Sequence, residues 1–355
     1  MLRILLVGDT HLGFDLPVRP RSHRLRRGPD FFACFREALG PARRGEVDLV
    51  VHGGDLLFRS RVPPSLVMAA LEPLLDLADR GVPVLIVPGN HERSALPYPL
   101  LAVHDHLHVL DRPRTVRLRL QGLDVAVSGF PCERDDIRAR FQERLAATLW
   151  QAPADIRLLC LHQTVEGATV GPANFVFRGG PDVLPARSIP PGFAAVLAGH
   201  IHRHQTLIRD LARRPLAAPV VYPGSSERTS FAERAEPKGF VILEVEPAKD
   251  RGGRLAGLAF HELPARPMEV VDVKVTGLAP DALTRRLAEI LCDVPRNAVV
   301  QLRCRGRLEA GSERALRTET LRDLHSPGMM VSVRFTPPDR PGDQREEAST
   351  GRELP

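Results

Sequence analysis

The sequence predicts an α/β protein with a large and a small domain, and three observations lead to this prediction. Over the first 200 residues, short runs rich in Val, Ile and Leu alternate with longer segments of helical periodicity, as buried strands and covering helices do. Most of the unusual polar residues follow the ends of these runs, where α/β proteins place their sites. Residues 268–336 repeat the alternation on a smaller scale.

The large domain, residues 1–264, is expected to contain short apolar strands bounded by glycine, proline or polar residues. In chain order they are Leu2–Val7, Leu49–His52, Val84–Val87, Val125–Ser128, Leu158–His162, Ala195–Ala198, Val241–Val245 and Leu255–His261. Helical periodicity predicts helices over Asp30–Leu39, Ser65–Arg80 and Asp135–Trp150. In the second helix Ser65 is the expected N-cap and Gly81 the stop signal, and Pro73 should kink the helix or split it in two.

The small domain, residues 268–336, follows a boundary marked by Pro264 and Pro267. Its pattern predicts strand, helix, strand, helix and strand over Glu269–Val275, Pro280–Cys292, Ala298–Arg303, Glu313–Leu324 and Met330–Phe335. Residues 337–355 are rich in proline and charge without periodicity, so we expect a mobile tail there.

The composition is that of a globular protein, with 43% hydrophobic and 26% charged residues. No apolar run approaches the ~18 residues of a membrane-spanning helix, and Leu2–Val7 is too short for a signal-peptide core, so we expect a cytoplasmic protein without membrane association. The five cysteines form no C-x-x-C pair, which argues against a disulfide framework. The net charge of +6 permits a polyanionic partner, but a general arginine bias explains it as well, since all but three of the 49 basic residues are arginines.

Five polar clusters follow five of the expected strands. They are Gly8-Asp9-Thr10-His11, Gly54-Asp55, Gly89-Asn90-His91-Glu92, Leu161-His162-Gln163 and Gly199-His200-Ile201-His202. Carboxylate and amide oxygens with neutral imidazoles suit Mn²⁺, Fe²⁺ or Zn²⁺. Residues two apart in an extended segment point the same way, so Asp9 and His11 can bind one ion, as can His200 and His202. Asn90 and His91 are adjacent, so we expect one to bind metal and the other to face the substrate.

In this order the clusters resemble those of the calcineurin-like metallophosphoesterases, and the resemblance covers about residues 1–262. It implies a two-sheet αββα sandwich with two divalent ions at the strand ends, most readily Mn²⁺, with Fe²⁺ or Zn²⁺ as alternatives. It also implies the site residues. Asp9, His11, Asp55 and His202 match one metal site; Asp55, Asn90, His162 and His200 match the other, with Asp55 bridging; His91 matches the catalytic histidine.

The segment from Gly224 to Glu233, followed by Lys238-Gly239-Phe240, is similar to one in SbcD-like DNA double-strand-break repair nucleases. Residues 53–58 resemble the same group, and the small domain stands where those nucleases carry a DNA-capping domain. The resemblance implies a metal-dependent DNA exonuclease, with endonuclease activity as an addition. A hydrolase of a small phosphodiester or nucleotide is the main alternative, and a DNA-binding scaffold with a vestigial metal site is a third. Leu56-Leu57-Phe58-Arg59 departs from the Asp-Arg-Gly of protein phosphatases.

Several further residues lie next to these motifs. Arg24, Arg27, Arg59 and Arg61 could contact the phosphate backbone of DNA or form an ordinary solvated surface, and His52 and His204 are expected to orient metal ligands. The resemblance implies DNA, a second copy of the chain and an SbcC-like ATPase as partners. Leu66–Leu77 and Leu96–Val103 could form the dimer face or belong to the core. No helical extension that would bind an ATPase coiled coil follows the small domain, which argues against that partner.

Overall fold

The computed structural model describes residues 1–15, 26–248 and 252–336. The chain forms two compact units, Met1–Ala265 and Arg266–Pro355. Arg24 and the tail expected over 337–355 lie outside the described residues. Among the described residues, no helix combines the length and the apolarity needed to cross a bilayer.

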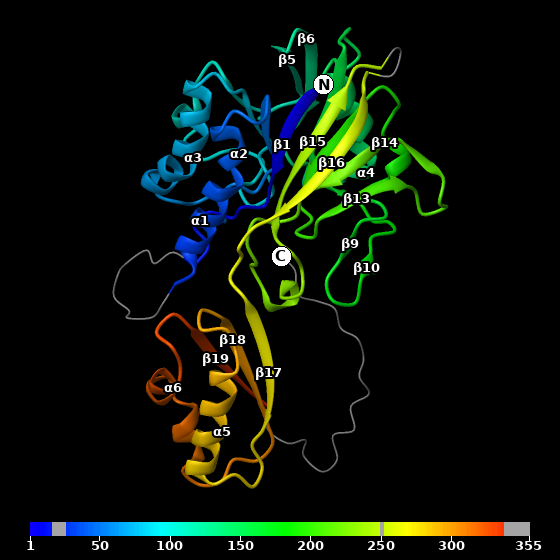
Figure 1. Ribbon diagram of the computed structural model, residues 1–355. Helices are drawn as coiled ribbons and strands as arrows, with labels where there is room; N and C mark the ends of the chain where they lie inside the picture. Colours follow the sequence, from blue (N-terminus) through cyan, green and yellow to red (C-terminus); the bar gives the residue numbers. More distant parts are fainter. Residues whose placement is uncertain (16–25, 249–251, 337–355) are drawn as a thin grey trace. The chain divides into compact units, whose positions relative to one another are not determined.

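The first unit contains two six-stranded sheets (Figure 1). The first sheet has the order β16 (Arg254–Glu262), β15 (Gly239–Glu246), β1 (Leu2–Val7), β2 (Leu49–His52), β3 (Val84–Ile86) and β4 (Leu107–Val109). The second has the order β13 (Gln205–Arg209), β14 (Pro215–Tyr222), β12 (Ala195–Gly199), β7 (Ile156–His162), β6 (Leu123–Gly129) and β5 (Arg114–Leu120). The strands β1, β2 and β3 run parallel, as do β6, β7, β12 and β14. Their carboxyl ends therefore gather at one edge of each sheet.

The two sheets pack face to face because their strands alternate side chains between two apolar surroundings. In β1, Ile4 and Leu6 point into the core between the sheets, where they join Leu158 and Leu197 of the second sheet. Leu5 points to the opposite side, into a core shared with helices. Continuous apolar runs are what strands buried on both faces require.

Helices cover both outer faces of the sandwich (Figure 1). The helix α1 (Gly28–Ala38) supplies Phe31 and Phe35 to the core on the first sheet, α2 (Gly40–Arg43) supplies Ala42, and α3 (Pro64–Asp79) supplies Leu71. The helix α4 (Ile137–Ala147) places Phe141 against the second sheet. The predicted αββα sandwich is therefore confirmed.

The helix α3 differs from the prediction in two respects. Its N-cap is Pro63 rather than Ser65, and Pro64 occupies the first turn, where proline's missing N–H costs nothing. Pro73 lies inside one continuous helix, so the expected split is wrong. Pro73 is buried, and apolar contacts of its ring offset the lost backbone hydrogen bond. Gly81, at φ +81°, ends the helical segment as predicted.

Short elements that the sequence pattern did not predict complete the first unit. Besides α2 and β4, they are β8 (Thr164–Val165), β9 (Thr169–Val170), β10 (Phe175–Val176), β11 (Val183–Leu184), and the single 3₁₀ turns η1 (Pro99–Ala102), η2 (Ala186–Ser188) and η3 (Phe231–Glu233). The longer strands β5 and β13 were not predicted either. Runs of two to four residues carry too little periodicity to be recognised in a sequence.

The second unit is a parallel sheet in the order β17 (Met268–Lys274), β18 (Val299–Arg305), β19 (Met330–Thr336). The helix α5 (Pro280–Cys292) packs Leu283 and Leu287 against Val273 and Leu302 of the sheet. The single helix expected over Glu313–Leu324 is instead a 3₁₀ turn, η4 (Ser312–Leu316), and a helix, α6 (Thr318–Leu324). Extended backbone at Arg317 separates the two.

Candidate metal centre

The expected ligands stand at the ends of β1, β2, β3, β7 and β12: His162 is the last residue of β7, and the others stand on the loops that follow their strands. The two sheets approach each other closely at this edge, because glycines occupy both sides of the contact. A Cβ added to Gly199 would lie 2.2 Å from the carbonyl oxygen of Gly53. Only residues without a side chain allow this approach, which brings ligands from both sheets into one space.

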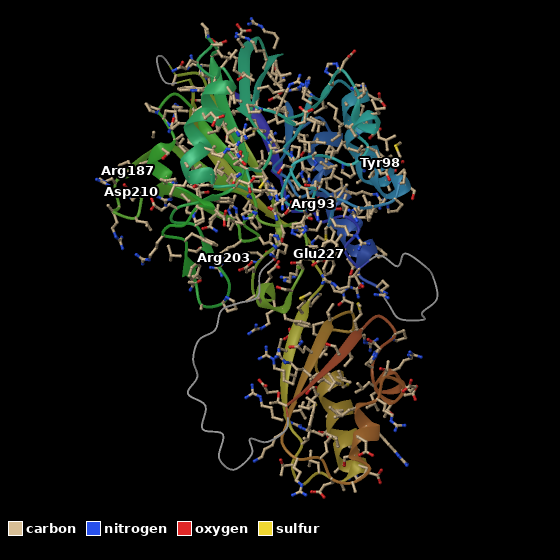
Figure 2. The ribbon with its side chains drawn as sticks, turned by 180° about the vertical axis from the view of Figure 1, so that it is seen from behind. Arg93, Tyr98, Arg187, Arg203, Asp210 and Glu227 are labelled. Atoms are coloured by element: carbon tan, nitrogen blue, oxygen red, sulfur yellow. The ribbon has the colours of Figure 1, made fainter. Side chains whose placement is uncertain are left out.

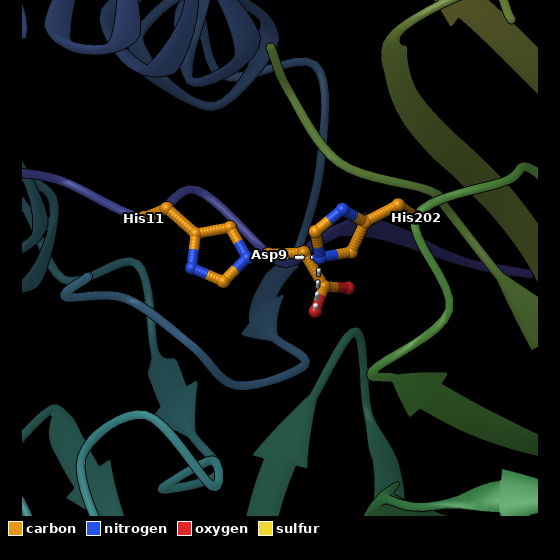
Figure 3. A group of neighbouring side chains, drawn as sticks. All are labelled: Asp9, His11 and His202. Carbon is orange, nitrogen blue, oxygen red and sulfur yellow. Dashed lines mark hydrogen bonds and ion pairs between the residues drawn. The ribbon is translucent and has the colours of Figure 1, made fainter. Parts of the chain in front are cut away.

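Asp9, His11 and His202 form the first cluster (Figure 3). The Nε2 atoms of His11 and His202 lie 2.9 Å apart, and His202 Nε2 lies 4.0 Å from Asp9 Oδ1. Two ligands ~2.1 Å from one ion and at right angles to each other lie about 3 Å apart. The spacing of the two imidazoles therefore fits a shared divalent cation.

A second group surrounds Asn90. His162 Nε2 and His200 Nδ1 each lie 3.0 Å from Asn90 Oδ1, and His162 Nε2 lies 3.4 Å from Asp55 Oδ2. The same Asp55 oxygen lies 4.0 Å from His11 Nε2. Asp55 thus stands between the two groups, in a position that suits a bridging carboxylate. The structure brings together all seven residues that the sequence assigned to metal.

The backbone around these ligands is held in an unfavourable conformation. Asp9, His11, Asp55 and His200 have φ values of 50°, 44°, 53° and 89°, in the left-handed region that side chains usually avoid. Hydrogen bonds between the loops after β1 and β2 hold this backbone conformation. Asp9 N–H donates to Gly54 O over 2.9 Å, and His11 N–H donates to Asp55 O over 2.9 Å. Such strain persists where the surrounding structure compels it, and it concentrates at functional sites.

His91 lies at the mouth of this space. Its Nδ1 donates to the carbonyl of Phe58 over 2.7 Å, which leaves Nε2 pointing toward Asp55 Oδ2 at 3.9 Å. Its side chain is 30% exposed, whereas those of His11 and His162 are buried. His91 can therefore reach a substrate as the buried histidines cannot. Its Nε2 also lies close enough to His11 and Asp55 to act as a ligand.

Burial and the neighbouring charges shift the pKa values of this cluster in opposite directions. Burial raises the pKa of Asp9 to about 6, although His162 and His202 oppose the shift. Burial alone would lower the pKa of His162, but the carboxylates of Asp55 and Asp9 raise it to about 9. Burial lowers the pKa of His200 to about 3 and also depresses that of His11. Asp55 is held ionised because His162 outweighs the effect of burial and lowers its pKa.

Two buried residues hold the ligand loops without binding metal themselves. Glu92 accepts hydrogen bonds from Leu57 N–H at 2.6 Å and Gly89 N–H at 2.8 Å. It thereby joins the second motif to the third. The sequence placed Glu92 inside a motif, but nothing there revealed its role. His52 bonds Thr10 Oγ1 at 3.0 Å and accepts from Gly54 N–H at 3.2 Å, so it supports the loops rather than a ligand side chain.

The remaining sequence-predicted residues are placed differently. Arg27 is buried and pairs with Glu227 at 3.1 Å (Glu227 is labelled in Figure 2), so its expected role as a surface phosphate contact gives way to an interior ion pair. Arg59 and Arg61 are exposed. His204 bonds the carbonyl of Tyr222 and stacks on Phe260. Within the described part of the chain, no hydrogen bond or ion pair joins its side chain to a candidate metal ligand.

Comparison with known proteins agrees with this geometry. The family model of the calcineurin-like phosphoesterases matches residues 2–204. The chain belongs to this family. The DNA double-strand break repair protein Mre11 of Haloferax volcanii is 29% identical over 282 residues, covering 78% of this chain and 56% of that protein. Mre11 of Saccharolobus solfataricus is 25% identical over 293 residues, covering 81% and 70%.

A bacterial relative is also named as a nuclease subunit. A protein of Bacillus subtilis that is named as a subunit of the nuclease SbcCD is 27% identical over 280 residues, covering 70% of this chain and 68% of that protein. The resemblance to SbcD-like nucleases drawn from the sequence is thereby confirmed. The chain spans little more than half the length of the Haloferax protein.

Metal binding should strengthen as the pH rises from 6.5 to 8.5. His162, with a pKa of about 9, must release its proton to become a ligand. One displaced proton gives about a tenfold gain in affinity per pH unit below that pKa, and below pH 6 protonation of Asp9 would weaken binding further. Titration calorimetry with Mn²⁺ in buffers of different ionisation enthalpy measures both the affinity and the released proton. His106→Ala, at an exposed histidine, is the control, and affinity independent of pH would contradict the assignment.

Proposed function

We propose that the protein is a DNA nuclease that uses two divalent metal ions, most readily Mn²⁺, to hydrolyse phosphodiester bonds in DNA repair. One observation supports this above all: seven candidate ligands from the ends of five strands converge beside His91, with two imidazole nitrogens 2.9 Å apart. The ligand set of carboxylates, an amide oxygen and imidazoles suits Mn²⁺. The names of the relatives from Haloferax, Saccharolobus and Bacillus support DNA as the substrate.

In this proposal seven of the residues would bind the metal ions and His91 would transfer a proton. Two bound cations would lower the pKa of an attacking water and neutralise charge on the phosphate. Asp9, His11, Asp55 and His202 would hold one ion, and Asp55, Asn90, His162 and His200 the other. His91 Nδ1–H is fixed on Phe58 O, so Nε2 is the nitrogen that faces the substrate. In the doubly protonated, imidazolium form of His91, Nε2 would donate the proton that the leaving oxygen takes up.

DNA contacts outside the centre are proposed for two regions. Arg59 and Arg61 are exposed and follow Asp55 closely in the chain. The residues of the small unit form the second region, which we propose as a DNA-capping domain. Lys274 and Arg305 are paired across its sheet, and both are exposed, as is Arg334. They lie on the face opposite α5, because Val273, Cys304 and Val333, which alternate with them, join the core.

We also propose that two copies associate through the surface near α3 and η1. Leu100 is 86% exposed and Val103 is 74% exposed, and Met68 and Tyr98 are exposed nearby (Tyr98 is labelled in Figure 2). Leu71 and Leu74, in the same stretch, are buried and belong to the core. An exposed group of large apolar side chains marks an interaction surface.

Two further points extend the proposal: the compartment, and an ATPase partner against which the sequence alone argued. The five cysteines are unpaired, which supports a reducing compartment such as the cytoplasm. An SbcC-like ATPase partner is suggested by the relative named as a subunit of the nuclease SbcCD. Copurification with such an ATPase would test this partner.

The nuclease proposal is tested by one set of assays. The purified chain with Mn²⁺ is offered labelled duplex DNA, single-stranded DNA and bis-p-nitrophenyl phosphate, with EDTA as the control. We expect cleavage of DNA that EDTA abolishes. Rapid hydrolysis of the small ester alone would favour a small-phosphodiester hydrolase, and duplex binding without cleavage under any metal would favour a scaffold.

His91→Gln should lower the DNA cleavage rate by about 10²- to 10⁴-fold, because proton transfer to the leaving oxygen is lost. The number of bound Mn²⁺ ions should stay the same, as measured by calorimetry and atomic absorption. His106→Ala again serves as the control. Loss of an ion in the His91 variant would show that His91 is a metal ligand and not the proton donor.

Leu100→Glu should convert a dimer to a monomer, because a charge placed at an apolar contact is costly to bury. Light scattering after size-exclusion chromatography measures the mass. Leu211→Glu, at an exposed leucine outside this surface, is the control and should leave the mass unchanged. A monomeric wild type would rule out the proposed interface.

A further inference from the structure

The segment from Gly224 to Phe240 distinguished the sequence as SbcD-like, yet none of its residues was assigned a role. In the structure it lies directly behind a candidate metal ligand. Glu233, at the end of η3, is buried, and so is Lys238, the residue immediately before β15. Both contact His202.

Glu233 accepts hydrogen bonds on both of its carboxylate oxygens. Oε1 accepts from His202 Nδ1 at 3.2 Å and from Thr229 Oγ1 at 2.6 Å. Oε2 lies 2.6 Å from Lys238 Nζ and accepts from Ser225 Oγ at 3.4 Å. An ionised carboxylate has no proton to give, so Nδ1 of His202 must carry the proton of this hydrogen bond. Nε2 is then the nitrogen with a lone pair, and it is the one that faces His11 at 2.9 Å.

Lys238 holds the backbone of the same residue. Its side chain is completely buried, and its Nζ donates to the carbonyl of His202 over 3.0 Å. The ammonium also balances the charge of Glu233, since burying an unpaired carboxylate is costly. The side chain and the backbone of His202 are thus fixed by two oppositely charged residues that contact each other.

We propose that Glu233 and Lys238 are a positioning pair that presents His202 Nε2 to the metal ion shared with Asp9 and His11. This rests on the proposed function, because it requires that His202 binds metal. A carboxylate behind a metal-binding histidine fixes its orientation and raises its basicity, and its loss commonly costs 10- to 100-fold in metal affinity.

Glu236 provides a matched comparison within the same segment. It is equally buried, lies 3.4 Å from Lys238 Nζ and pairs with Arg203 at 3.0 Å. No contact between the Glu236 carboxylate and a candidate ligand side chain occurs among the described residues. A purely structural role for buried carboxylates here predicts the same effect from both glutamates, whereas positioning of His202 predicts an effect from Glu233 alone.

The test compares Glu233→Gln with Glu236→Gln in the full chain. Mn²⁺ is titrated by calorimetry and by electron paramagnetic resonance, with circular dichroism melts to confirm folding. We expect wild type and Glu236→Gln to bind two ions alike. We expect Glu233→Gln to bind one ion with 10- to 100-fold lower affinity and the other unchanged.

Other outcomes overturn different statements. Two ions bound by Glu233→Gln with wild-type affinity would refute the positioning role, and so would an equal loss in both glutamine variants. A wild type that binds no Mn²⁺ would refute the proposed function itself. If Glu233→Gln does not fold, Glu233→Asp keeps the charge beside Lys238 but shortens the reach to His202. Wild-type affinity in that variant would likewise refute the inference.

Discussion

The burial of two carboxylates governs the structure of this site. Asp9 and Asp55 lie at the edge where the sheets meet, and both are buried. Ionised groups in such a place need compensating positive charge. Among the described residues, no lysine or arginine pairs with either of them; their partners are histidines and backbone N–H groups. The compensating positive charge must come from protonated imidazoles or from bound cations. Only bound cations leave the imidazoles unprotonated, and therefore free to act as ligands.

This requirement explains the backbone that surrounds the carboxylates. The loops after β1 and β2 hydrogen-bond to each other while Asp9, His11 and Asp55 adopt left-handed conformations. Each such residue costs of order 1–3 kcal/mol and persists only where its surroundings compel it. The cost is tolerated because the strands that lead into the loops are buried on both faces. The large core therefore serves the site by holding it in a geometry that the loops alone would not adopt.

The sequence was informative wherever the signal is local. The strand Leu2–Val7 was predicted to the residue, because five apolar residues in a run of six, followed by a glycine and a carboxylate, allow few other structures. The candidate ligands were found from motifs at strand ends, and the structure brings their side chains together. What failed depends on tertiary contacts: an arginine in a basic loop gives no sign that it will be buried, as Arg27 is. Likewise, Pro73 breaks a helix in isolation but not when its ring is packed into a core.

The signature segment shows why support for a site is harder to recognise than its ligands. Glu227 pairs with Arg27 at the start of α1 and accepts from Cys34 Sγ in the same helix. Glu233, six residues on, bonds His202. One short segment thus connects the helical layer of the first sheet to a ligand supplied by the second. Ligands must be particular residue types at particular strand ends, so they form motifs. Supporting residues need only contact a ligand or its backbone from elsewhere in the fold, so they form no motif. These contacts are visible only in the folded structure.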